Sequence, residues 1–365
     1  MRRTVVLAVL VGSLTVMGAA APAPQAEPAS ELTRAVRAFA AAHDFSGTVL
    51  VARGDRILFH EAFGLANRAF DVPAALDTKY RIASITKLFT AVLVLQLQES
   101  GRLELDAPIA RYLRDYPGEG ADRITVRSLL HHTSGLRNFD QIGSYEEAAT
   151  TGMEAYQLPH TPADLLRRYA AGPLLHEVGT TFDYNNGDYV ILGAIIERLT
   201  GASYADALAT RILGPLGLAD TGLARQQDIV ARLAPTYMRP EPSAPLINDM
   251  PVYIQNWWAA GGMYSTTTDL LAFARGLYGG KLLRPASLQA LLTPGLDDYG
   301  CGLWVTSMDI GGRAHRFAQR PGRIMGANTL LLRYLDDDVT VVILGNTNLA
   351  DTDAFGFLIG RTLLA

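Results

Sequence analysis

The sequence is poor in cysteine and lysine and has no excess of positive charge. Its single cysteine, Cys301, excludes an internal disulfide and any metal site built from several cysteines. The 32 basic and 36 acidic residues give a formal net charge of -4, which offers no electrostatic basis for binding nucleic acid. With 49% apolar and 19% charged residues, the 365-residue chain can bury a large core. Disordered, collagenous and coiled-coil classes are therefore excluded.

The N-terminus has the pattern of a secretory signal peptide. Arg2 and Arg3 precede an apolar stretch over residues 4–17, and small residues follow at 18–21. We expect cleavage after Ala20, which makes residues 1–20 a signal peptide and residues 21–30 a flexible leader. The alternative is an uncleaved anchor, but the apolar stretch is shorter than the roughly 20 residues that span a bilayer. The sequence thus predicts a periplasmic or secreted protein without a stable membrane anchor.

The expected elements place strands at both ends of the mature chain and helices in its middle. A helix over 31–43 precedes β-rich runs over 47–52 and 56–63, which are joined by a turn at Gly54-Asp55. The remaining β-rich runs lie near the C-terminus, over 302–307, 314–319, 329–335 and 339–344, with a last helix over 353–364. Between them, a mostly helical stretch covers about 77–277, with helices expected over 84–100, 126–130, 162–169, 187–200 and 204–213.

This order predicts one α/β domain over 31–365. We expect an antiparallel sheet built from about 31–76 and 278–365, flanked by helices, with a large helical subdomain inserted beside it. The run over 339–344 is apolar on both faces and must be covered on both sides, for which the terminal helices are the expected covers. A functional site is expected in the cleft between the sheet and the helical subdomain.

The most informative local pattern is Ser84-Ile85-Thr86-Lys87. Ser84 and Lys87 are three residues apart at the start of a helix and therefore share one face. A serine hydroxyl needs a base to become a nucleophile, and a lysine with a lowered pKa can serve or support that base. Lys87 is the only charge between Ile82 and Leu97, so an unpaired ammonium would be costly there. The alternative is a lysine that reaches solvent from a core helix.

Around these residues the sequence resembles the class C β-lactamase and penicillin-binding-protein superfamily of serine hydrolases. The resemblance runs from about Phe45 to the end of the chain. It is carried, in the same order as in the family, by segment 81–87 and by four further motifs: Leu129-Leu-His-His-Thr-Ser-Gly-Leu136, Gly179-Thr-Thr-Phe-Asp-Tyr-Asn-Asn-Gly187, Pro215-Leu-Gly-Leu218 and Gly261-Gly-Met-Tyr-Ser-Thr266. It implies the β-lactamase/transpeptidase-like fold and a serine hydrolase that needs no cofactor and no metal.

The resemblance assigns roles to two further elements. Tyr184-Asn185-Asn186 matches the family's Tyr-x-Asn, which implies a base or proton shuttle at Tyr184 and a substrate contact at Asn186. A phenol becomes a base at neutral pH only beside a positive charge, which Lys87 can supply. Tyr184 as a core aromatic residue and Asn186 as a helix N-cap are the alternatives.

Arg320-Pro321-Gly322 stands where the family has Lys-Thr-Gly or His-x-Gly. The arginine keeps the cation expected to hold a substrate carboxylate, although a solvent-facing charge at a strand end is the alternative. Pro321 supplies neither a hydroxyl nor an N–H, which argues against β-lactam turnover. Gly322 permits close approach of substrate, and the N–H groups of Ser84 and Arg323 are the expected oxyanion hole.

Other features are expected to be structural. His131-His132 has no second ligand cluster at suitable spacing and is not predicted to bind metal. Trp257-Trp258 is expected in the core, with walling of the substrate pocket as the alternative. Cys301 is expected to be a buried small residue.

We therefore predict a secreted serine hydrolase that works through a Ser84 acyl-enzyme on an ester, a D-amino-acid peptide or a β-lactam. A carboxypeptidase or esterase is favoured over a true β-lactamase. A module that binds penicillin or cell-wall peptide without turnover is the alternative from another class. The expected partner is a small-molecule or peptide substrate, and the sequence leaves the oligomeric state open.

Overall fold

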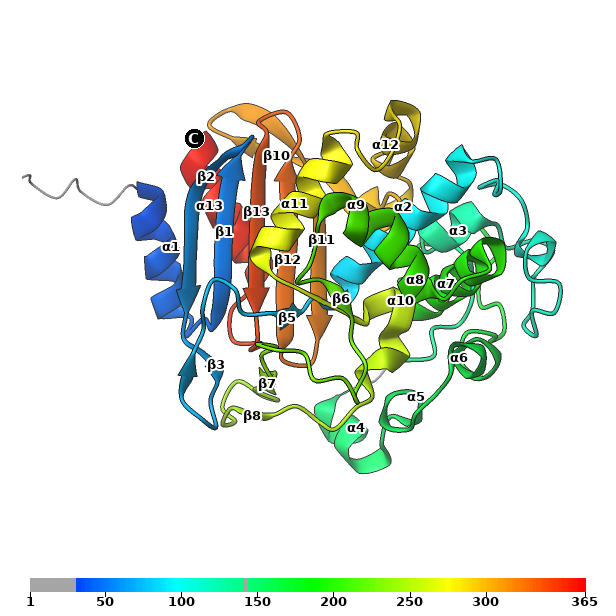
Figure 1. Ribbon diagram of the computed structural model, residues 1–365, viewed down its shortest axis with the longest axis horizontal. Coiled ribbons are helices and arrows are strands. Elements are labelled where there is room, and N and C mark those ends of the chain that lie inside the picture. Colours follow the sequence, from blue (N-terminus) through cyan, green and yellow to red (C-terminus); the bar gives the residue numbers. More distant parts are fainter. Residues whose placement is uncertain (1–30, 141–143) are drawn as a thin grey trace, which may run out of the picture.

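The computed structural model describes residues 31–140 and 144–365, so the predicted signal peptide and leader lie outside the described residues. Its centre is a six-stranded sheet in the order β10-β11-β12-β13-β1-β2 (Figure 1). All five pairings are antiparallel. The strands are β1 (Gly47–Arg53), β2 (Arg56–Phe63), β10 (Trp304–Ile310), β11 (Arg313–Ile324), β12 (Ala327–Tyr334) and β13 (Val339–Gly345). The prediction of one antiparallel sheet built from both ends of the chain is confirmed.

The two ends of the chain meet where β1 pairs with β13, with Gly47 opposite Gly345. Every residue of β13 is buried. Its side chains alternate between two apolar clusters: Val341 and Ile343 lie in one, and Val342 and Leu344 lie in the other. Because both faces of this strand bury apolar side chains, each must be covered by helices.

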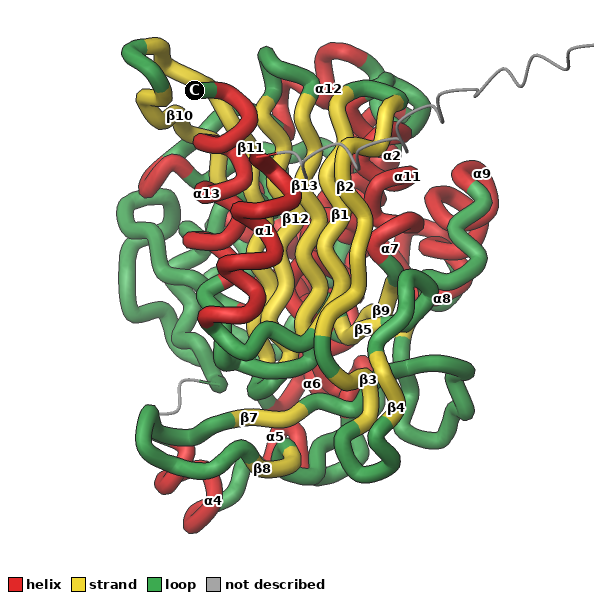
Figure 2. Tube along the Cα trace, turned by 90° about the vertical axis from the view of Figure 1, so that its left-hand side faces the viewer, coloured by secondary structure: helices red, strands yellow, loops and turns green. Residues whose placement is uncertain are grey.

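The terminal helices cover only one of these faces, which corrects the expectation above. α1 (Glu31–Ala42) and α13 (Thr352–Leu364) lie on the same side of the sheet (Figure 2). There the rings of Phe39 and Phe355 stack with centroids 4.2 Å apart. The opposite face is covered by α2 (Thr86–Glu99) and α11 (Thr267–Tyr278), whose apolar side chains belong to the other cluster. The terminal helices pack on each other, and the inserted segment therefore supplies the second layer.

The inserted segment is mostly helical, as predicted, and also contains short strands. Its remaining helices are α3 (Val126–Leu130), α4 (Tyr145–Thr151), α5 (Glu154–Gln157), α6 (Pro162–Arg168), α7 (Asn186–Thr200), α8 (Tyr204–Leu208), α9 (Gly214–Leu216) and α10 (Trp258–Gly261), and α12 (Pro285–Leu291) follows it. Small sheets join β3 (Leu65–Asn67) to β4 (Val72–Pro73), β5 (Tyr80–Arg81) to β9 (Met263–Ser265) and β6 (Gly222–Leu223), and β7 (Tyr237–Met238) to β8 (Ile247–Asn248). Strands of two or three residues are too short to show an alternating pattern.

α2 passes through the middle of the molecule and presents its first turn to the sheet. Eleven of its 14 residues are buried, including Lys87. The turn that leads into it, η1 (Ala83–Ile85), holds Ala83 at a φ of 47°, a left-handed conformation that residues with a side chain rarely adopt. This strained turn places Ser84 at the junction of the sheet and the helical segment. Within the described residues, no helix combines the length and apolarity needed to cross a membrane.

Candidate active site

The predicted site residues meet at the end of β11. β10 pairs with β11 only as far as Trp304 opposite Gln319, so the last residues of β11 have a free edge. Ser84 lies beside this edge on η1, and Tyr184 comes from the loop that precedes α7. Together they border a pocket of about 230 Å³ lined by Ser84, Tyr184, Trp304, Arg320, Pro321 and Arg323. The structure thus brings together residues from three distant parts of the sequence.

The phenol of Tyr184 and the ammonium group of Lys87 converge on the Ser84 hydroxyl. Tyr184 OH lies 2.8 Å from Ser84 Oγ, and Lys87 Nζ lies 3.2 Å from the same atom. Lys87 Nζ also donates to Asn186 Oδ1 at 2.5 Å and to the Ala260 carbonyl at 2.8 Å. An ammonium group has three donors, and each has an acceptor here. The alternative of a lysine that reaches solvent is wrong, because Lys87 is fully buried.

Burial and neighbouring charge shift the pKa of both partners of Ser84. Burial lowers the pKa of Lys87 to about 8. Burial alone would raise the pKa of Tyr184, but the charges of Arg320 and Lys87 outweigh it, and the pKa of the phenol is lowered overall. A phenol with a lowered pKa beside a serine hydroxyl has the geometry and the basicity for proton transfer.

Arg320 lies at the pocket, but its guanidinium group points inward. Only 1% of the residue is exposed, so the alternative of a solvent-facing strand-end charge is wrong. Its Nη2 donates to Tyr184 OH at 2.6 Å and its Nη1 to Tyr299 OH at 2.9 Å. Nε donates to the Ser84 carbonyl at 2.7 Å. Three of its five N–H groups thus bind Tyr184, Tyr299 and Ser84, and the contact of Arg320 with a substrate carboxylate stays a prediction.

Asn186 is held by protein groups at both ends of its amide. Oδ1 accepts from Lys87, and Nδ2 donates to Asp140 Oδ2 at 2.6 Å. The alternative that Asn186 caps the helix is wrong, because the cap of α7 is Asn185, whose side chain accepts from the Gly187 N–H. Asn186 thus orients the Lys87 ammonium, and its contact with substrate stays a prediction.

Gly322 permits the close approach between β11 and the nucleophile turn. A Cβ atom at this position would lie 2.3 Å from the Ile82 carbonyl oxygen and 3.2 Å from Ser84 N, so any side chain would separate the two segments. Arg323 follows on the strand; its side chain is half exposed and donates to Asp353 Oδ2 at 2.6 Å. An oxyanion hole formed by the N–H groups of Ser84 and Arg323 stays a prediction.

Sequence reasoning missed the aromatic residues that surround Arg320. The Trp304 ring lies 5.3 Å from the guanidinium carbon and is nearly parallel to the Tyr184 ring, at 6.3 Å. Tyr299 is fully buried beside both. The alternative that Trp257-Trp258 walls the pocket is wrong, because Trp257 stacks on Tyr156 at 3.9 Å and both tryptophans are buried away from the pocket lining. No motif distinguishes Trp304 or Tyr299 in the sequence.

The two adjacent histidines face different surroundings. His131 Nδ1 lies 3.1 Å from the Tyr299 carbonyl oxygen, and its Nε2 lies 3.5 Å from the sulfur of Cys301, which is buried as predicted. His132 is paired with Asp188 at 3.0 Å. Across the part of the chain that the structure describes, no three His, Cys, Asp or Glu side chains form a group that could hold a metal ion.

A serine that shares hydrogen bonds with a buried lysine and a tyrosine, at the junction of an antiparallel sheet and a helical segment, defines a serine hydrolase of the lysine–tyrosine type. Comparison with known proteins agrees. The chain belongs to the Beta-lactamase family, whose model matches residues 32–356.

Proteins with different names are similar to this chain in sequence or in fold. Penicillin-binding protein 4* of Bacillus subtilis (strain 168) is 30% identical over 322 residues, which cover 83% of this chain and 68% of the relative. Esterase EstB of Burkholderia gladioli is 37% identical over 179 residues, or 47% of this chain and 45% of the esterase. The solved structure of a D-stereospecific amidohydrolase from Streptomyces sp. superposes with a TM-score of 0.76 at 26% identity, over 92% of this chain and 99% of that one. The chain thus spans about two thirds of the first relative's length and less than half of the second's.

Proposed function

We propose that this protein hydrolyses neutral esters or amides through an acyl-enzyme on Ser84. The observation that carries the proposal is the convergence of Tyr184 OH and Lys87 Nζ on Ser84 Oγ. Secretion to the periplasm or the medium, by the N-terminal signal described above, is part of the same proposal. No cofactor and no metal enters the mechanism.

The chemistry follows from the protonation states of the three residues. Tyr184, ionised beside Arg320 and the Lys87 ammonium, takes the hydroxyl proton of Ser84 as Oγ attacks the substrate carbonyl. The N–H groups of Ser84 and Arg323 bind the oxyanion that forms. Tyr184 then gives its proton to the leaving group, which departs as an alcohol or amine. In the second half, Tyr184 takes a proton from water, the hydroxide attacks the acyl-enzyme, and Ser84 recovers its proton as the acid leaves.

The preference for neutral substrates rests on what the pocket presents. Arg320 is buried with its donors aimed at Tyr184, Tyr299 and Ser84, and the Arg323 side chain is bonded to Asp353. Pro321 offers neither a hydroxyl nor an N–H to a substrate carboxylate. Trp304 presents an apolar ring to the pocket instead. These features suit an ester or a D-amino-acid amide better than a β-lactam or a peptide that ends in a free carboxylate. The names of similar proteins support this preference, since they include an esterase and a D-stereospecific amidohydrolase.

The proposal is tested by intact-mass labelling and by turnover. The mature protein is incubated with a fluorophosphonate and with penicillin, and initial rates are measured on p-nitrophenyl esters, a D-amino-acid amide, a D-Ala-D-Ala peptide and nitrocefin. We expect kcat/KM to be highest on a neutral ester or the amide. A higher kcat/KM on the D-Ala-D-Ala peptide or nitrocefin would contradict the substrate preference. Labelling without turnover on any of the four would instead indicate a binding module.

Arg320→Ala should lower kcat/KM for neutral and carboxylate-bearing substrates alike. A buried charge-assisted hydrogen bond to the phenol is worth about 1.5–3 kcal/mol, which corresponds to roughly a ten- to hundredfold loss. Arg320→Lys keeps a cation near Tyr184 and should lose less. The measurement compares kcat/KM on one charged and one neutral substrate in variants whose melting temperatures match. A loss confined to the charged substrate would show that the guanidinium reads a substrate carboxylate after all.

A further inference from the structure

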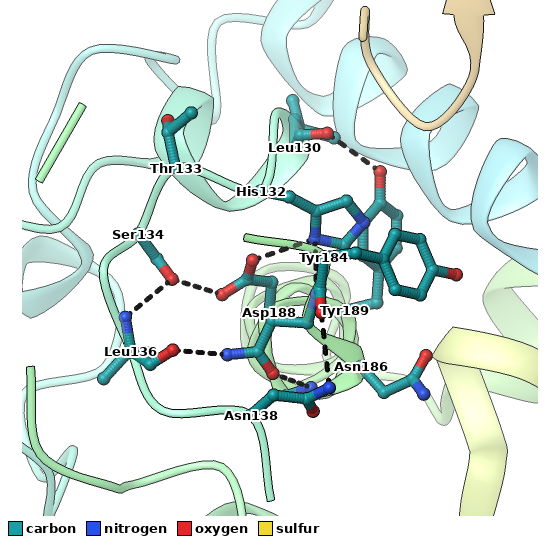
Figure 3. A network of polar contacts seen from close by, with 12 residues as sticks. Leu130, His132, Thr133, Ser134, Leu136, Asn138, Tyr184, Asn186, Asp188 and Tyr189 are labelled. Atoms are coloured by element: carbon teal, nitrogen blue, oxygen red, sulfur yellow. Dashed lines mark hydrogen bonds and ion pairs between the residues drawn. The ribbon is translucent and has the colours of Figure 1, made fainter. Parts of the chain in front are cut away.

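One histidine behind the site binds the backbone on both sides of Tyr184. The His132 carbonyl oxygen accepts from the Asp183 N–H at 2.9 Å, and His132 Nδ1 accepts from the Asn185 N–H at 3.2 Å. Its ring also lies against the Tyr184 ring, with centroids 4.4 Å apart (Figure 3). His132 thus holds the Asp183 N–H through its carbonyl oxygen, and it holds the Asn185 N–H and one face of the Tyr184 ring through its side chain.

The conformation of His132 is itself held from behind. Its φ of 54° lies in the left-handed region, which is unfavourable for a residue with a side chain and persists only where the surroundings enforce it. Asp188 Oδ2 lies 3.0 Å from His132 Nδ1, and Ser134 Oγ donates to Asp188 Oδ1 at 2.6 Å. Figure 3 shows Ser134, Asp188 and His132 as a row of side chains that leads to Tyr184. His132 and its two supporting side chains, Asp188 and Ser134, are all buried.

The hydrogen-bond pattern fixes the charge state of this row. A nitrogen that accepts from the Asn185 N–H carries no proton of its own, so the His132 ring is neutral. Burial and the nearby Lys87 and Arg320 hold the pKa of His132 well below its usual value. Burial raises the pKa of Asp188 well above its usual value, which favours its uncharged acid form. The row therefore adds no charge next to Tyr184.

We propose that His132 is a positioning residue for Tyr184: as a neutral ring held by Asp188 and Ser134, it fixes the phenol between Ser84 and Arg320. The inference rests on the proposed function, in which Tyr184 carries the proton. The hydroxyl of Tyr184 has to satisfy two distances at once, 2.8 Å to Ser84 Oγ and 2.6 Å to Arg320 Nη2. The Trp304 ring and the Asn138 amide also contact Tyr184, but the His132 side chain is the group that both accepts from the next N–H and packs on the phenol ring. Loss of this side chain would release the Asn185 N–H and one face of the ring, and we expect the hydroxyl to move out of this position.

The ionisation of Tyr184 reports its position directly. Its pKa is lowered because the hydroxyl sits next to Arg320 and Lys87, so a displaced ring should titrate at higher pH. The titratable and charged groups that face it from the elements packed around it are Lys87 on α2, Arg320 on β11, Tyr189 and Asp188 on α7, and Tyr156, Tyr299 and His132. Substitution of His132 leaves all the other members of this set in place.

The test compares His132→Leu with His132→Asn. Leucine removes the acceptor, whereas the amide oxygen of asparagine lies close to the place of Nδ1 and can accept from the Asn185 N–H. The mature protein is labelled with ¹³Cζ-tyrosine, and the Tyr184 signal is assigned by its loss in Tyr184→Phe. His131→Leu is the matched control, since His131 contacts neither flanking peptide of Tyr184. In the same variants kcat and KM are measured on a neutral ester.

We expect Tyr184 to titrate at higher pH in His132→Leu and near its wild-type pH in His132→Asn and His131→Leu. We expect kcat to fall roughly ten- to hundredfold in His132→Leu, with KM little changed, because the loss is one of orientation. Asp188→Asn, whose amide has the same shape as the acid and no charge, should leave the Tyr184 titration where it is in the wild type.

An unchanged titration of Tyr184 in a folded His132→Leu variant would overturn the proposal. So would a His132→Asn variant that loses as much kcat as His132→Leu at a similar melting temperature. If His132→Leu does not fold, the titration of Tyr184 is compared in His132→Asn and Asp188→Asn. A raised Tyr184 pKa in both of these variants would contradict the proposal that Ser134, Asp188 and His132 form a neutral hydrogen-bonded row. The NMR titration needs no substrate, so a protein that hydrolyses no ester or amide would refute the proposed function and leave this inference open to its own test.

Discussion

Ser84→Ala should abolish covalent labelling and turnover together. Without Oγ no acyl-enzyme can form, and Tyr184 and Lys87 lose the atom on which they converge. Removal of a catalytic nucleophile typically costs roughly 10⁴- to 10⁶-fold in kcat, the remainder coming from binding and the oxyanion hole. The measurement is intact mass after fluorophosphonate treatment, with initial rates on a neutral ester and peptide mapping of the labelled wild type.

The control is Ser100→Ala, an exposed serine at the C-terminal cap of α2, the helix that follows the Ser84 turn. It should label and turn over like the wild type. Ser84 is half-buried at a strained turn, so a melting curve of each variant separates loss of the nucleophile from loss of the fold. A label that maps to another residue, or activity that survives Ser84→Ala, would remove Ser84 from the mechanism.

The sheet could be predicted from the sequence because its strands carry local signals. The β-rich run over 56–63 coincides with β2, and the turn at Gly54-Asp55 lies where the chain reverses. The apolar run over 339–344 lies within β13. The strand predicted over 314–319 ended too early. In the structure, β11 continues through Arg320-Pro321-Gly322 to Ile324. Proline and glycine usually end a strand, but here they lie where β11 has lost its β10 partner and needs no donor on that side.

The site was predictable as a set of residues and not as a set of contacts. The spacing of Ser84 and Lys87 predicts that they share a helix face, and the structure places Nζ 3.2 Å from Oγ. The direction of the Arg320 side chain depends on Tyr299 and Trp304, whose rings lie beside its guanidinium group. Neither aromatic residue lies in one of the sequence motifs. Tertiary packing decides that the arginine donates to Tyr184.

The partner of Asn186 could not be predicted for a similar reason. Asp140 lies 46 residues from Asn186 and is joined to it only in the folded protein. The Tyr156 hydroxyl is bonded to the same carboxylate oxygen. Asp140 also acts on Lys87 by charge, in the direction that favours the ammonium form. The folded structure thus adds an acidic residue behind the site, and this residue lies outside the sequence motifs.

Lys87→Arg should be nearly as damaging as Lys87→Ala. Nζ occupies a fully buried position with three acceptors, Ser84 Oγ, Asn186 Oδ1 and the Ala260 carbonyl. A guanidinium group is larger and planar, and its donors cannot reach all three acceptors. Loss of a group that supports proton transfer typically costs about 10²- to 10⁴-fold. The check is kcat/KM on a neutral ester. If Lys87→Arg keeps more than about a tenth of the activity, a loss of under ~1.4 kcal/mol, Lys87 is a simple counter-charge.

The pH profile reports the charge state of Lys87 in the wild type. Burial lowers the pKa of Lys87 to about 8, so the group is an ammonium below that pH and becomes neutral as the pH rises through it. As an ammonium it favours the ionised form of Tyr184, and its deprotonation removes that support. We therefore expect kcat/KM to fall on the alkaline side with a midpoint near 8. Arginine does not titrate in this range, so any residual activity of Lys87→Arg should lack this alkaline limb. An alkaline limb that persists unchanged in Lys87→Arg would assign the titration to a group other than Lys87.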